Sequence, residues 1–388
     1  MGYRSAVRDI GDLHSLTDYV LIADEATAFK NSKTQVHQTV AHLAKNAKRV
    51  WALTATLIKN NLIEGWGIYK VLVPDLFPSK NRFMNHYCIV RMQPIGRGRR
   101  QIPIIVGYRS KDVEAFRSKI DPFFLGRPKF KVASELPPLT TSVVEISMSK
   151  AQGLKYAEAL SGLLEVIVDD ELEEKEVSKL TAVIYCQQIV NHLRLIGHEG
   201  ESTKLKRLTE LLTEGDLVGE KVIIFSRFRK MVDIIMETLQ TNKIQATRIT
   251  GSENEAQRDK AQTLFQDPEG DVKVICITTA AAEAVNLQAA KAIVFFDTPW
   301  SAGDYIQLLG RMIRIGSTHD RCHAFHLVVK GSIDSRVMEV LNRKMNLVEQ
   351  VLGKRIKGDS DEIEFDSRND ISDLFEALKE DAMRMGGS

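Results

Sequence analysis

The chain has 388 residues with 53 lysines and arginines against 51 acidic residues, so a formal net charge of +2 excludes a strongly acidic or basic protein. Its 44% hydrophobic and 27% charged residues exclude a disordered chain and allow two or three domains. It has no apolar run of membrane-spanning length, no signal peptide, and four distant cysteines that form neither a zinc nor a disulfide framework. We therefore expect a cytoplasmic protein without a membrane partner.

The first third of the chain predicts two buried strands, at residues 19–23 and 49–53, and two helices, at residues 32–47 and 62–72. Asp24 and Glu25 follow the first strand, and Thr54 follows the second. Because open α/β sheets bind ligands at the carboxyl ends of their strands, both strand ends are candidate site positions.

The middle of the chain is more polar and then helical. Residues 93–105 form a predicted loop with three arginines, either a solvated basic loop or a contact to a nucleic-acid backbone. Residues 150–195 are predicted to be mostly helical, with an acidic stretch at residues 169–176, and we interpret them as a helical insertion or bridge.

The second half alternates strands with helices, which predicts a parallel sheet. The strands are expected at residues 221–225, 247–250, 272–278 and 292–296, and the helices at residues 231–240 and 332–351. From residue 358 the chain is acidic and polar, so we expect a loosely ordered tail or a segment that binds a partner.

Two strand ends carry groups suited to a metal-bound nucleotide. A carboxylate such as Asp24 can hold Mg²⁺ through water, and a second carboxylate such as Glu25 can activate the attacking water. Thr54 and Thr56 can hydrogen-bond a nearby carboxylate. Each pattern by itself is more typical of a helix cap, a loop or a turn than of such a site.

Arg311 and Arg314 lie in the stretch QLLGRMIRIG, three residues apart. Helical spacing would place them on one face, and Gly310 would let another backbone approach. Two guanidinium groups suit a polyphosphate, because they bind its oxygens in bidentate fashion and never lose their charge. The alternative is a solvated basic helix at a domain edge.

Further hydroxyls and amides follow the strands of the second half. They belong to Ser226, Arg227, Thr250, Gly251 and Thr278. Such groups at strand ends or helix starts bind phosphate well, although each is also an ordinary cap.

Taken together, these stretches resemble the Snf-type branch of superfamily-two helicases, which are ATP-driven translocases on double-stranded DNA. The resemblance covers roughly residues 19–351, which is most of the chain, and the long run that ends in QLLGRMIRIGS carries it most specifically. The matching segments are VLIADEATAFKN, WALTATLIKNNLIEGWGIYKVL, PFFLGRPKFKVASELPPLTTSVVEISMSKAQ, KVIIFSRFRKMVDII, RITGS and VICITTAAAEAVNLQAAKAIVFFDTPWSAGDYIQLLGRMIRIGS. The resemblance implies an α/β protein with two RecA-like parallel-sheet lobes, a truncated first lobe and a helical insertion between them.

The resemblance also implies cofactors and roles. ATP and Mg²⁺ would be the cofactors, with Asp24 on the metal and Glu25 as the base. Thr54 and Thr56 would couple the nucleotide site to DNA. The second lobe would supply the remaining groups. Gln307 and Gly310 would shape the last motif, and Arg311 and Arg314 would reach the nucleotide, with at least one of them as the arginine finger. The residues that would face the DNA backbone are Ser226, Arg227, Thr250, Gly251 and Thr278.

One departure from the family pattern is large. The family needs a glycine-rich loop ending in Gly-Lys-Ser/Thr to hold the β- and γ-phosphates, and the 388 residues contain no such sequence. We expect this chain alone to bind ATP weakly and to hydrolyse it slowly or not at all. A sheet without its opening strands should also expose an edge and an apolar face, so we expect a polypeptide that supplies the missing half-lobe, or a poorly ordered first lobe.

Smaller departures lie within the motifs themselves. Thr27 replaces a histidine, Ala55 replaces a glycine, and Gly126 replaces an arginine of the family pattern. Ala281, Ala282 and Ala284 stand where the family has glycines, and alanine there favours helix and disfavours positive φ.

We divide the chain into four segments. Residues 1–135 form a partial first lobe, 136–200 a linker and helical insertion, 201–352 the second lobe, and 353–388 an acidic, flexible tail. The predicted function is part of an ATP-dependent translocase on double-stranded DNA whose phosphate-binding loop comes from a partner or from upstream sequence. The alternatives are a non-catalytic DNA-binding clamp or scaffold derived from such a motor, and an unrelated α/β enzyme.

Overall fold

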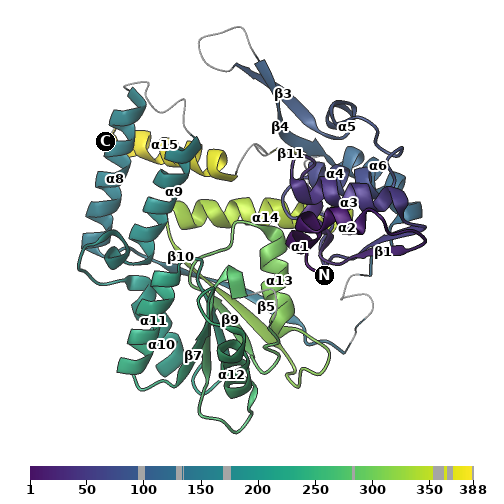
Figure 1. The fold of residues 1–388 in the computed structure, drawn as a ribbon. Coiled ribbons are helices and arrows are strands. Elements are labelled where there is room, and N and C mark those ends of the chain that lie inside the picture. The colour runs from purple at the N-terminus through teal and green to yellow at the C-terminus, as the bar shows by residue number, and fades with distance from the viewer. Residues whose placement is uncertain are drawn as a thin grey trace. The chain divides into compact units, whose positions relative to one another are not determined.

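The computed structural model describes residues 1–94, 101–127, 133, 135–168, 176–281, 285–352, 362–364 and 370–386 (Figure 1). They divide into two compact units. Unit 1 comprises Met1–Gly126, Ser301–Gly303 and Asn342–Arg368, and unit 2 comprises Arg127–Trp300, Asp304–Leu341 and Asn369–Ser388. This division follows compactness alone, and the four segments proposed from the sequence stay a prediction.

Unit 1 is built on a small parallel sheet. Its strands β1 (Val20–Ala23) and β2 (Arg49–Ala52) pair in the register Val20 to Arg49. The helices of this unit are α1 (Tyr3–Arg8), α2 (Ile10–Leu13), α3 (Gln35–Asn46), α4 (Leu62–Leu72), α5 (Lys80–Tyr87) and α6 (Ser110–Ile120), with the 3-10 turns η1 (Ala26–Phe29) and η2 (Asp121–Phe123). Aromatic side chains fill the core, where Phe77 contacts the rings of Tyr69, Phe83, Tyr87 and Phe116.

One face of the β1–β2 sheet is open to solvent. Val20, Ile22, Trp51 and Leu53 are between 49% and 58% exposed. Because side chains alternate along a strand and Ile22 pairs with Trp51, these four lie on the same face. The opposite face packs Leu21, Ala23 and Ala52 into the core of unit 1. The expectation of an exposed apolar sheet face is therefore confirmed.

A second, antiparallel sheet of unit 1 has the order β11-β4-β3. Its strands are β3 (Ile89–Pro94), β4 (Gln101–Arg109) and β11 (Glu362–Glu364). Part of the predicted loop at residues 93–105 is thus strand, because Ile104 and Ile105 are buried and pair with β3. Its three arginines lie outside the described residues.

Unit 2 contains a six-stranded, wholly parallel sheet of order β5-β10-β9-β6-β8-β7. The strands are β5 (Leu139–Ile146), β6 (Val222–Phe225), β7 (Ala246–Ile249), β8 (Val274–Ile277), β9 (Ala292–Phe295) and β10 (Cys322–Val329). Every residue of β6, β8 and β9 is buried, as expected for parallel strands covered on both faces. The predicted α/β class with a parallel sheet is confirmed.

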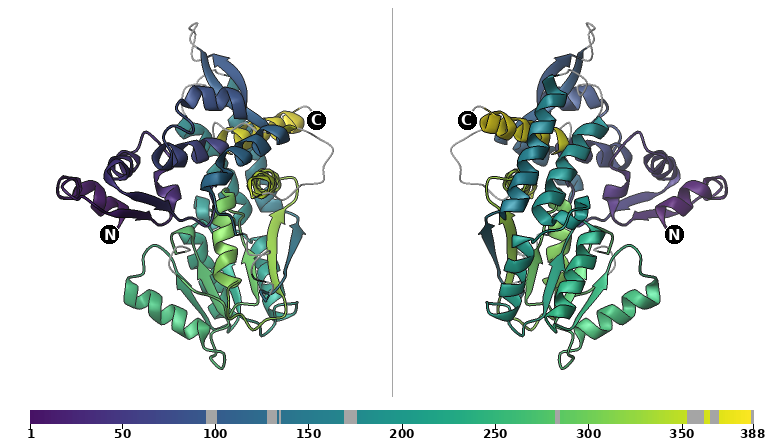
Figure 2. Two further views of the ribbon diagram at one scale, coloured as in Figure 1. Left: turned by 90° about the vertical axis from the view of Figure 1, so that its right-hand side faces the viewer. Right: turned by 90° about the vertical axis from the view of Figure 1, so that its left-hand side faces the viewer.

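Helices cover both sides of this sheet (Figure 2). Side chains from α9, α10 and α11 pack on one face, and Tyr305 of α13 packs against Phe295 on the other. The helices of unit 2 are α8 (Lys150–Val168), α9 (Glu176–Asn191), α10 (Thr203–Thr213), α11 (Arg229–Thr241), α12 (Glu255–Gln266) and α15 (Asp370–Gly386), with the 3-10 turns η3 (Leu193–Ile196) and η4 (Thr279–Ala281). Helix α13 (Ala302–Met312) belongs to unit 2 except for its first two residues, and α14 (Ile333–Val351) contributes residues to both units.

Two elements of unit 2 lie in segments that the sequence assigned to a linker and a tail. Strand β5 lies within the segment predicted to link the lobes, yet it pairs along its whole length with β10. Helix α15 lies within the predicted flexible tail, yet it is ordered and buries Leu374, Phe375 and Leu378 in the core. Helix α15 is amphipathic, and its apolar face packs against the core. The overall acidic composition of the segment does not reveal this pattern.

The described part of the chain contains no helix that is both long and apolar enough to cross a membrane. All four cysteines are buried free thiols.

Candidate functional site

The acidic pair lies at the carboxyl end of β1. Asp24 and Glu25 are both exposed, and Glu25 adopts left-handed backbone angles with φ of 51°. The Asp24 carboxylate accepts the Glu25 amide at 2.8 Å, and the Tyr3 hydroxyl donates to the Asp24 carbonyl. Burial, together with the charges of the two acids, raises the pKa of Tyr3 to about 12, so this hydroxyl remains a donor at neutral pH.

The threonine motif lies at the same edge of the sheet. The Leu53 amide donates to Ala23 at 2.8 Å, and the Ala26 amide donates to Leu53 at 2.9 Å, so the two strand ends are adjacent. Thr54 donates to the Thr56 carbonyl at 2.8 Å. The Thr56 hydroxyl is buried and has no hydrogen-bond partner among the described residues. The structure thus brings Asp24, Glu25, Thr54 and Thr56 together.

A buried carboxylate next to these motifs was not identified from the sequence. Glu64 of α4 accepts hydrogen bonds from the Lys59 amide at 2.7 Å and the Asn60 amide at 3.0 Å, and pairs with Lys30 at 2.5 Å. It therefore fixes the loops that follow both the acidic and the threonine motifs. The one sequence signal for Glu64 is its position in NNLIEGW, within a segment that matches the family pattern.

The described residues contain no cluster of three or more acidic, histidine or cysteine side chains that could enclose a metal. A single exposed carboxylate at a strand end fits Mg²⁺ that receives its other ligands from water and nucleotide phosphates. Asp24 suits that role, and the phosphate-binding loop that would complete the site is absent from the sequence.

In unit 2, helix α13 carries the arginine motif. The buried Gln307 and the half-buried Gly310 lie within the helix, and the half-buried Arg311 lies in its last turn. Arg314 is exposed and lies beyond Met312, where the helix ends. The argument that helical spacing places both arginines on one face is therefore wrong, because the chain turns at Ile313 before reaching Arg314.

The five residues predicted to face DNA divide into two groups. Ser226, Thr250 and Thr278 are almost completely buried. Ser226 donates to Asp297 at 2.5 Å, and Thr250 donates to Glu253 at 2.7 Å. Arg227 and Gly251 reach the surface, so in this conformation they are the two members of the group that a phosphate can approach.

The hydroxyls of Thr250 and Ser252 donate hydrogen bonds to the Glu253 carboxylate. Burial raises the pKa of the Glu253 carboxyl, but the hydrogen bonds from Thr250 and Ser252 outweigh it and lower the pKa overall. Arg248 lies within 3.4 Å of the same carboxylate. The Glu253 carboxylate therefore fixes the loop after β7 on which Gly251 lies.

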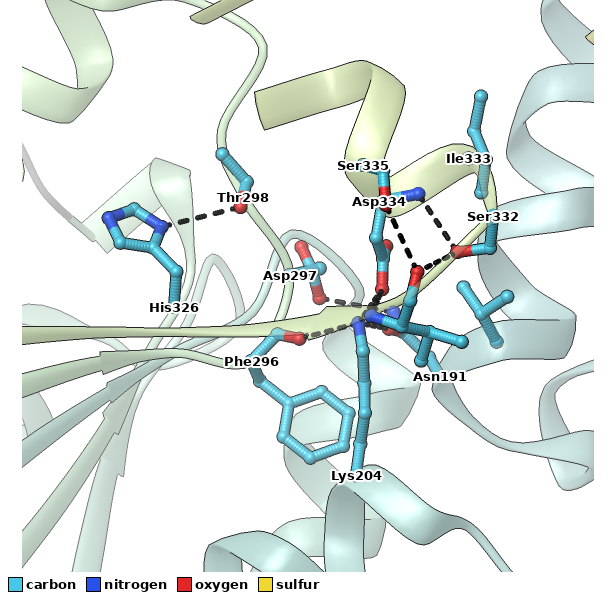
Figure 3. Close-up of polar contacts among 12 residues, drawn as sticks. Asn191, Lys204, Phe296, Asp297, Thr298, His326, Ser332, Ile333, Asp334 and Ser335 are labelled. Atoms are coloured by element: carbon cyan, nitrogen blue, oxygen red, sulfur yellow. Dashed lines mark hydrogen bonds and ion pairs between the residues drawn. The ribbon is translucent and has the colours of Figure 1, made fainter. Parts of the chain in front are cut away.

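A buried polar network joins the sheet edge of unit 2 to three helices (Figure 3). Lys204 of α10 is fully buried and donates to Asn191 at 3.0 Å and to the Phe296 carbonyl at 2.9 Å, and it pairs with Asp334 at 2.5 Å. Asn191 at the end of α9 donates in turn to Asp297 at 3.2 Å. Asp297, which follows β9, also accepts the Ser226 hydroxyl and the Arg227 amide at 2.8 Å.

Burial raises the pKa of the Asp297 carboxyl, although its hydrogen bonds from Ser226 and Arg227 oppose this shift. Three donors satisfy the carboxylate, so a fully buried acid is retained at the carboxyl edge of the sheet. The network thereby holds the β6–α11 turn, which carries Arg227, against the end of α9.

His326 of β10 makes the stability of unit 2 sensitive to acid. The imidazole stacks on Phe295 and contacts the hydroxyls of Thr298 at 3.4 Å and Tyr305 at 3.3 Å. Burial lowers its pKa from 6.5 to about 4. Between these values the unfolded chain binds the proton and the folded chain does not, so the stabilisation is complete above pH 6.5 and is lost as the pH falls toward 4.

We therefore expect this one group to lower the free energy of unfolding of unit 2 by about 3 kcal/mol between neutral pH and pH 4. Urea unfolding followed by circular dichroism at several pH values measures the effect. His326→Phe keeps the ring stack and should flatten this part of the profile. An equally steep profile in the variant would contradict the assignment.

Comparison with known proteins gives a consistent result. The family model described as SNF2-related domain matches residues 2–195, and the model described as helicase conserved C-terminal domain matches residues 203–316. Protein CHROMATIN REMODELING 5 of Arabidopsis thaliana is 25% identical over 91% of this chain. The ISWI chromatin-remodeling complex ATPase ISW1 of Saccharomyces cerevisiae is 23% identical over the whole of it.

The chain spans 20% of the length of the first of these relatives and 34% of the second. Among solved structures, the SWI2/SNF2 ATPase core of Sulfolobus solfataricus in complex with dsDNA is 25% identical, with a TM-score of 0.47 over 91% of this chain and 72% of that one.

Proposed function

Because the chain belongs to the SNF2-related family, we propose that it is part of an ATP-dependent motor that translocates along double-stranded DNA. The observation that carries the proposal is the strand-end group of unit 1, where two carboxylates and two threonines meet at one sheet edge within the family match. Parallel sheets bind ligands at this edge, and phosphoryl transfer needs a carboxylate for the metal and another for water.

The residues have separate roles in this proposal. Asp24 holds the metal, Glu25 orients and deprotonates the attacking water, and Thr54 and Thr56 link the nucleotide site to DNA. When bound, Mg²⁺ neutralises charge on the phosphates of ATP. Arg311 and Arg314 stabilise charge that develops on the transferred group, while Gln307 and Gly310 shape the helix that carries Arg311.

DNA binding in the proposal rests on the surface of unit 2. Arg227 and Gly251 contact the phosphate backbone, and the buried Ser226, Thr250 and Thr278 support the loops that carry them. Phosphate contacts of this kind position a protein on the duplex without reading its sequence. The proposed protein is therefore DNA-associated and sequence-tolerant.

We further propose that a polypeptide segment outside residues 1–388, on a partner or on the same polypeptide, supplies the phosphate-binding loop. The open face of β1–β2 with Val20, Ile22, Trp51 and Leu53 supports this, because parallel sheets are normally covered on both faces. A segment that adds strands and a covering helix would bury these side chains and place its loop next to Asp24.

The absent loop also favours a second candidate function, a DNA-binding clamp without catalysis. Such a clamp would bind duplex DNA in a salt-dependent manner and would not bind nucleotide. The two candidates differ in what happens when the missing segment is added.

We expect the chain of residues 1–388 to bind a fluorescent ATP analogue with a Kd weaker than about 1 mM, because no lysine and amide cradle holds the phosphates. Equilibrium titration with and without duplex DNA measures this, and Asp24→Asn is the matched control for binding through Mg²⁺. Adding a segment with the phosphate loop should restore DNA-stimulated hydrolysis. A fast ATPase in the chain alone would contradict the missing cradle, and DNA binding with no nucleotide binding after addition would favour the clamp.

A further inference from the structure

Arg227 is held in an unusual position for a surface arginine. Its guanidinium lies over the indole of Trp300, 3.7 Å from the ring centroid. The same group donates to the side-chain oxygen of Gln187 at 3.0 Å. Trp300 follows β9 and Gln187 belongs to α9, so two separate elements fix one flexible side chain.

Gln187 is buried at a cost. It is fully inaccessible, and its side-chain nitrogen has no hydrogen-bond partner within the described residues. A buried donor left without a partner costs about 1–3 kcal/mol. A nonpolar side chain of similar volume would avoid that cost. The stability of the fold therefore does not explain why this position is glutamine, whereas the hydrogen bond from Arg227 to its side-chain oxygen does.

Helix α9 contacts the same turn at a second point. Asn191 is one helical turn after Gln187, so both side chains lie on one face of α9. Asn191 donates to Asp297, which in turn accepts the Arg227 amide. One face of α9 therefore holds the backbone of Arg227 through Asp297 and its side chain through Gln187.

The surroundings of the stack suit an anion. Arg229 and Lys230, both exposed, open helix α11 directly after the turn. The N-cap residue Phe228 provides no side-chain hydrogen bond to the first amides of this 13-residue helix. The N-terminus of this helix, together with the positive charges of Arg227, Arg229 and Lys230, favours the binding of a phosphate group.

We propose that Gln187 is a positioning residue that fixes the Arg227 guanidinium on Trp300, so that the stack presents a pre-oriented cation to a backbone phosphate of duplex DNA. This inference rests on the proposed DNA function. A free arginine side chain loses considerable rotamer entropy when it binds, and fixing it beforehand reduces that loss. A planar guanidinium can donate to a phosphate from its edge while its face rests on the indole.

The test separates the position of Arg227 from DNA binding. 5-Fluorotryptophan is incorporated at the three tryptophans, and Trp300→Phe assigns the Trp300 resonance in fluorine NMR. Gln187→Met removes both polar atoms at nearly constant volume, whereas Gln187→Glu keeps the acceptor. Binding of each variant to a short DNA duplex is titrated at several salt concentrations.

We expect Gln187→Met to shift the Trp300 resonance toward that of Arg227→Ala and to weaken duplex binding about tenfold. The slope of log affinity against log salt should fall by about one. Gln187→Glu should retain the wild-type resonance, because the acceptor of the Arg227 guanidinium is kept. The unfolding midpoint of Gln187→Met should be unchanged or higher, because the unpartnered donor is gone.

A Gln187→Met protein with the wild-type resonance and affinity, beside an Arg227→Ala protein altered in both, would overturn the role of Gln187 and leave the DNA function intact. If no form binds duplex, the proposed function fails together with the phosphate contact, and the resonance alone decides how Arg227 is placed. Arg227→Lys leaves the core untouched and should also lose the stacked resonance, so the inference stays testable if Gln187→Met does not fold.

Discussion

Arg311→Ala should reduce DNA-stimulated ATP hydrolysis at least about a thousandfold in a motor completed with the phosphate-binding segment. The reason is electrostatic: charge that spreads over the transferred phosphoryl group would lose a fixed cation that costs no reorganisation. Steady-state turnover at saturating DNA and ATP measures the loss. Duplex affinity should stay within about twofold of wild type, because Arg311 is assigned to the nucleotide rather than the DNA backbone.

The matched variants sharpen this result. Arg314→Ala should also abolish most turnover, and a difference between the two arginines would identify which one is the finger. Glu25→Gln should stop hydrolysis by a different route, because the amide cannot accept the proton of water while Asp24 still holds the metal. That variant should retain bound ATP. If Arg311→Ala instead lost DNA binding and kept normal turnover, Arg311 would bind DNA and not the nucleotide.

The sequence predicted the motif-bearing strands well for a physical reason. Residues 20–23 and 222–225 are uninterrupted apolar runs, the pattern that the buried strands of parallel sheets require. Residues 222–225 are buried as predicted, whereas the predicted burial of residues 20–23 is wrong on one face, where Val20 and Ile22 are exposed. Each is followed directly by the polar residues of its motif. Two independent signals, apolar continuity and an abrupt polar end, therefore mark the same boundary.

Two of the strands that were missed, β5 and β10, lack this signal. β5 reads LTTSVVEI, and its residues alternate between partly buried and exposed at the edge of the sheet. β10 reads CHAFHLVV, where two histidines interrupt the apolar pattern, yet His326 is fully buried. Tertiary burial of a neutral imidazole decides the structure there, and local composition does not show it.

The roles of polar residues were harder to predict than their positions. Ser226 looked like a phosphate ligand because it follows a strand, but its hydroxyl is used by Asp297, 71 residues later. Asn191 and Asp297 are 106 residues apart, and neither forms a local pattern. Contacts between residues so far apart in the sequence depend on which strands and helices become neighbours in the fold. The spacing of residues along the chain therefore does not identify them.

The same network gives the largest expected effect on stability. Lys204→Met should lower the free energy of unfolding of unit 2 by about 3–5 kcal/mol, because it leaves the buried Asp334 carboxylate without its cation. The Asn191 oxygen and the Phe296 carbonyl lose a donor as well. Urea unfolding at neutral pH, followed by circular dichroism, measures the change.

Two further variants separate the buried charge from ordinary helix effects. Lys206→Met makes the same substitution at an exposed position of α10 and should change stability by less than about 0.5 kcal/mol. Lys204→Met combined with Asp334→Asn removes the unpaired charge and should recover much of the loss, since the main cost of the single change is the orphaned carboxylate. A single variant as stable as wild type would mean that Asp334 finds other donors, and the network would then not be what holds α9 and α10 to the sheet edge that carries Arg227.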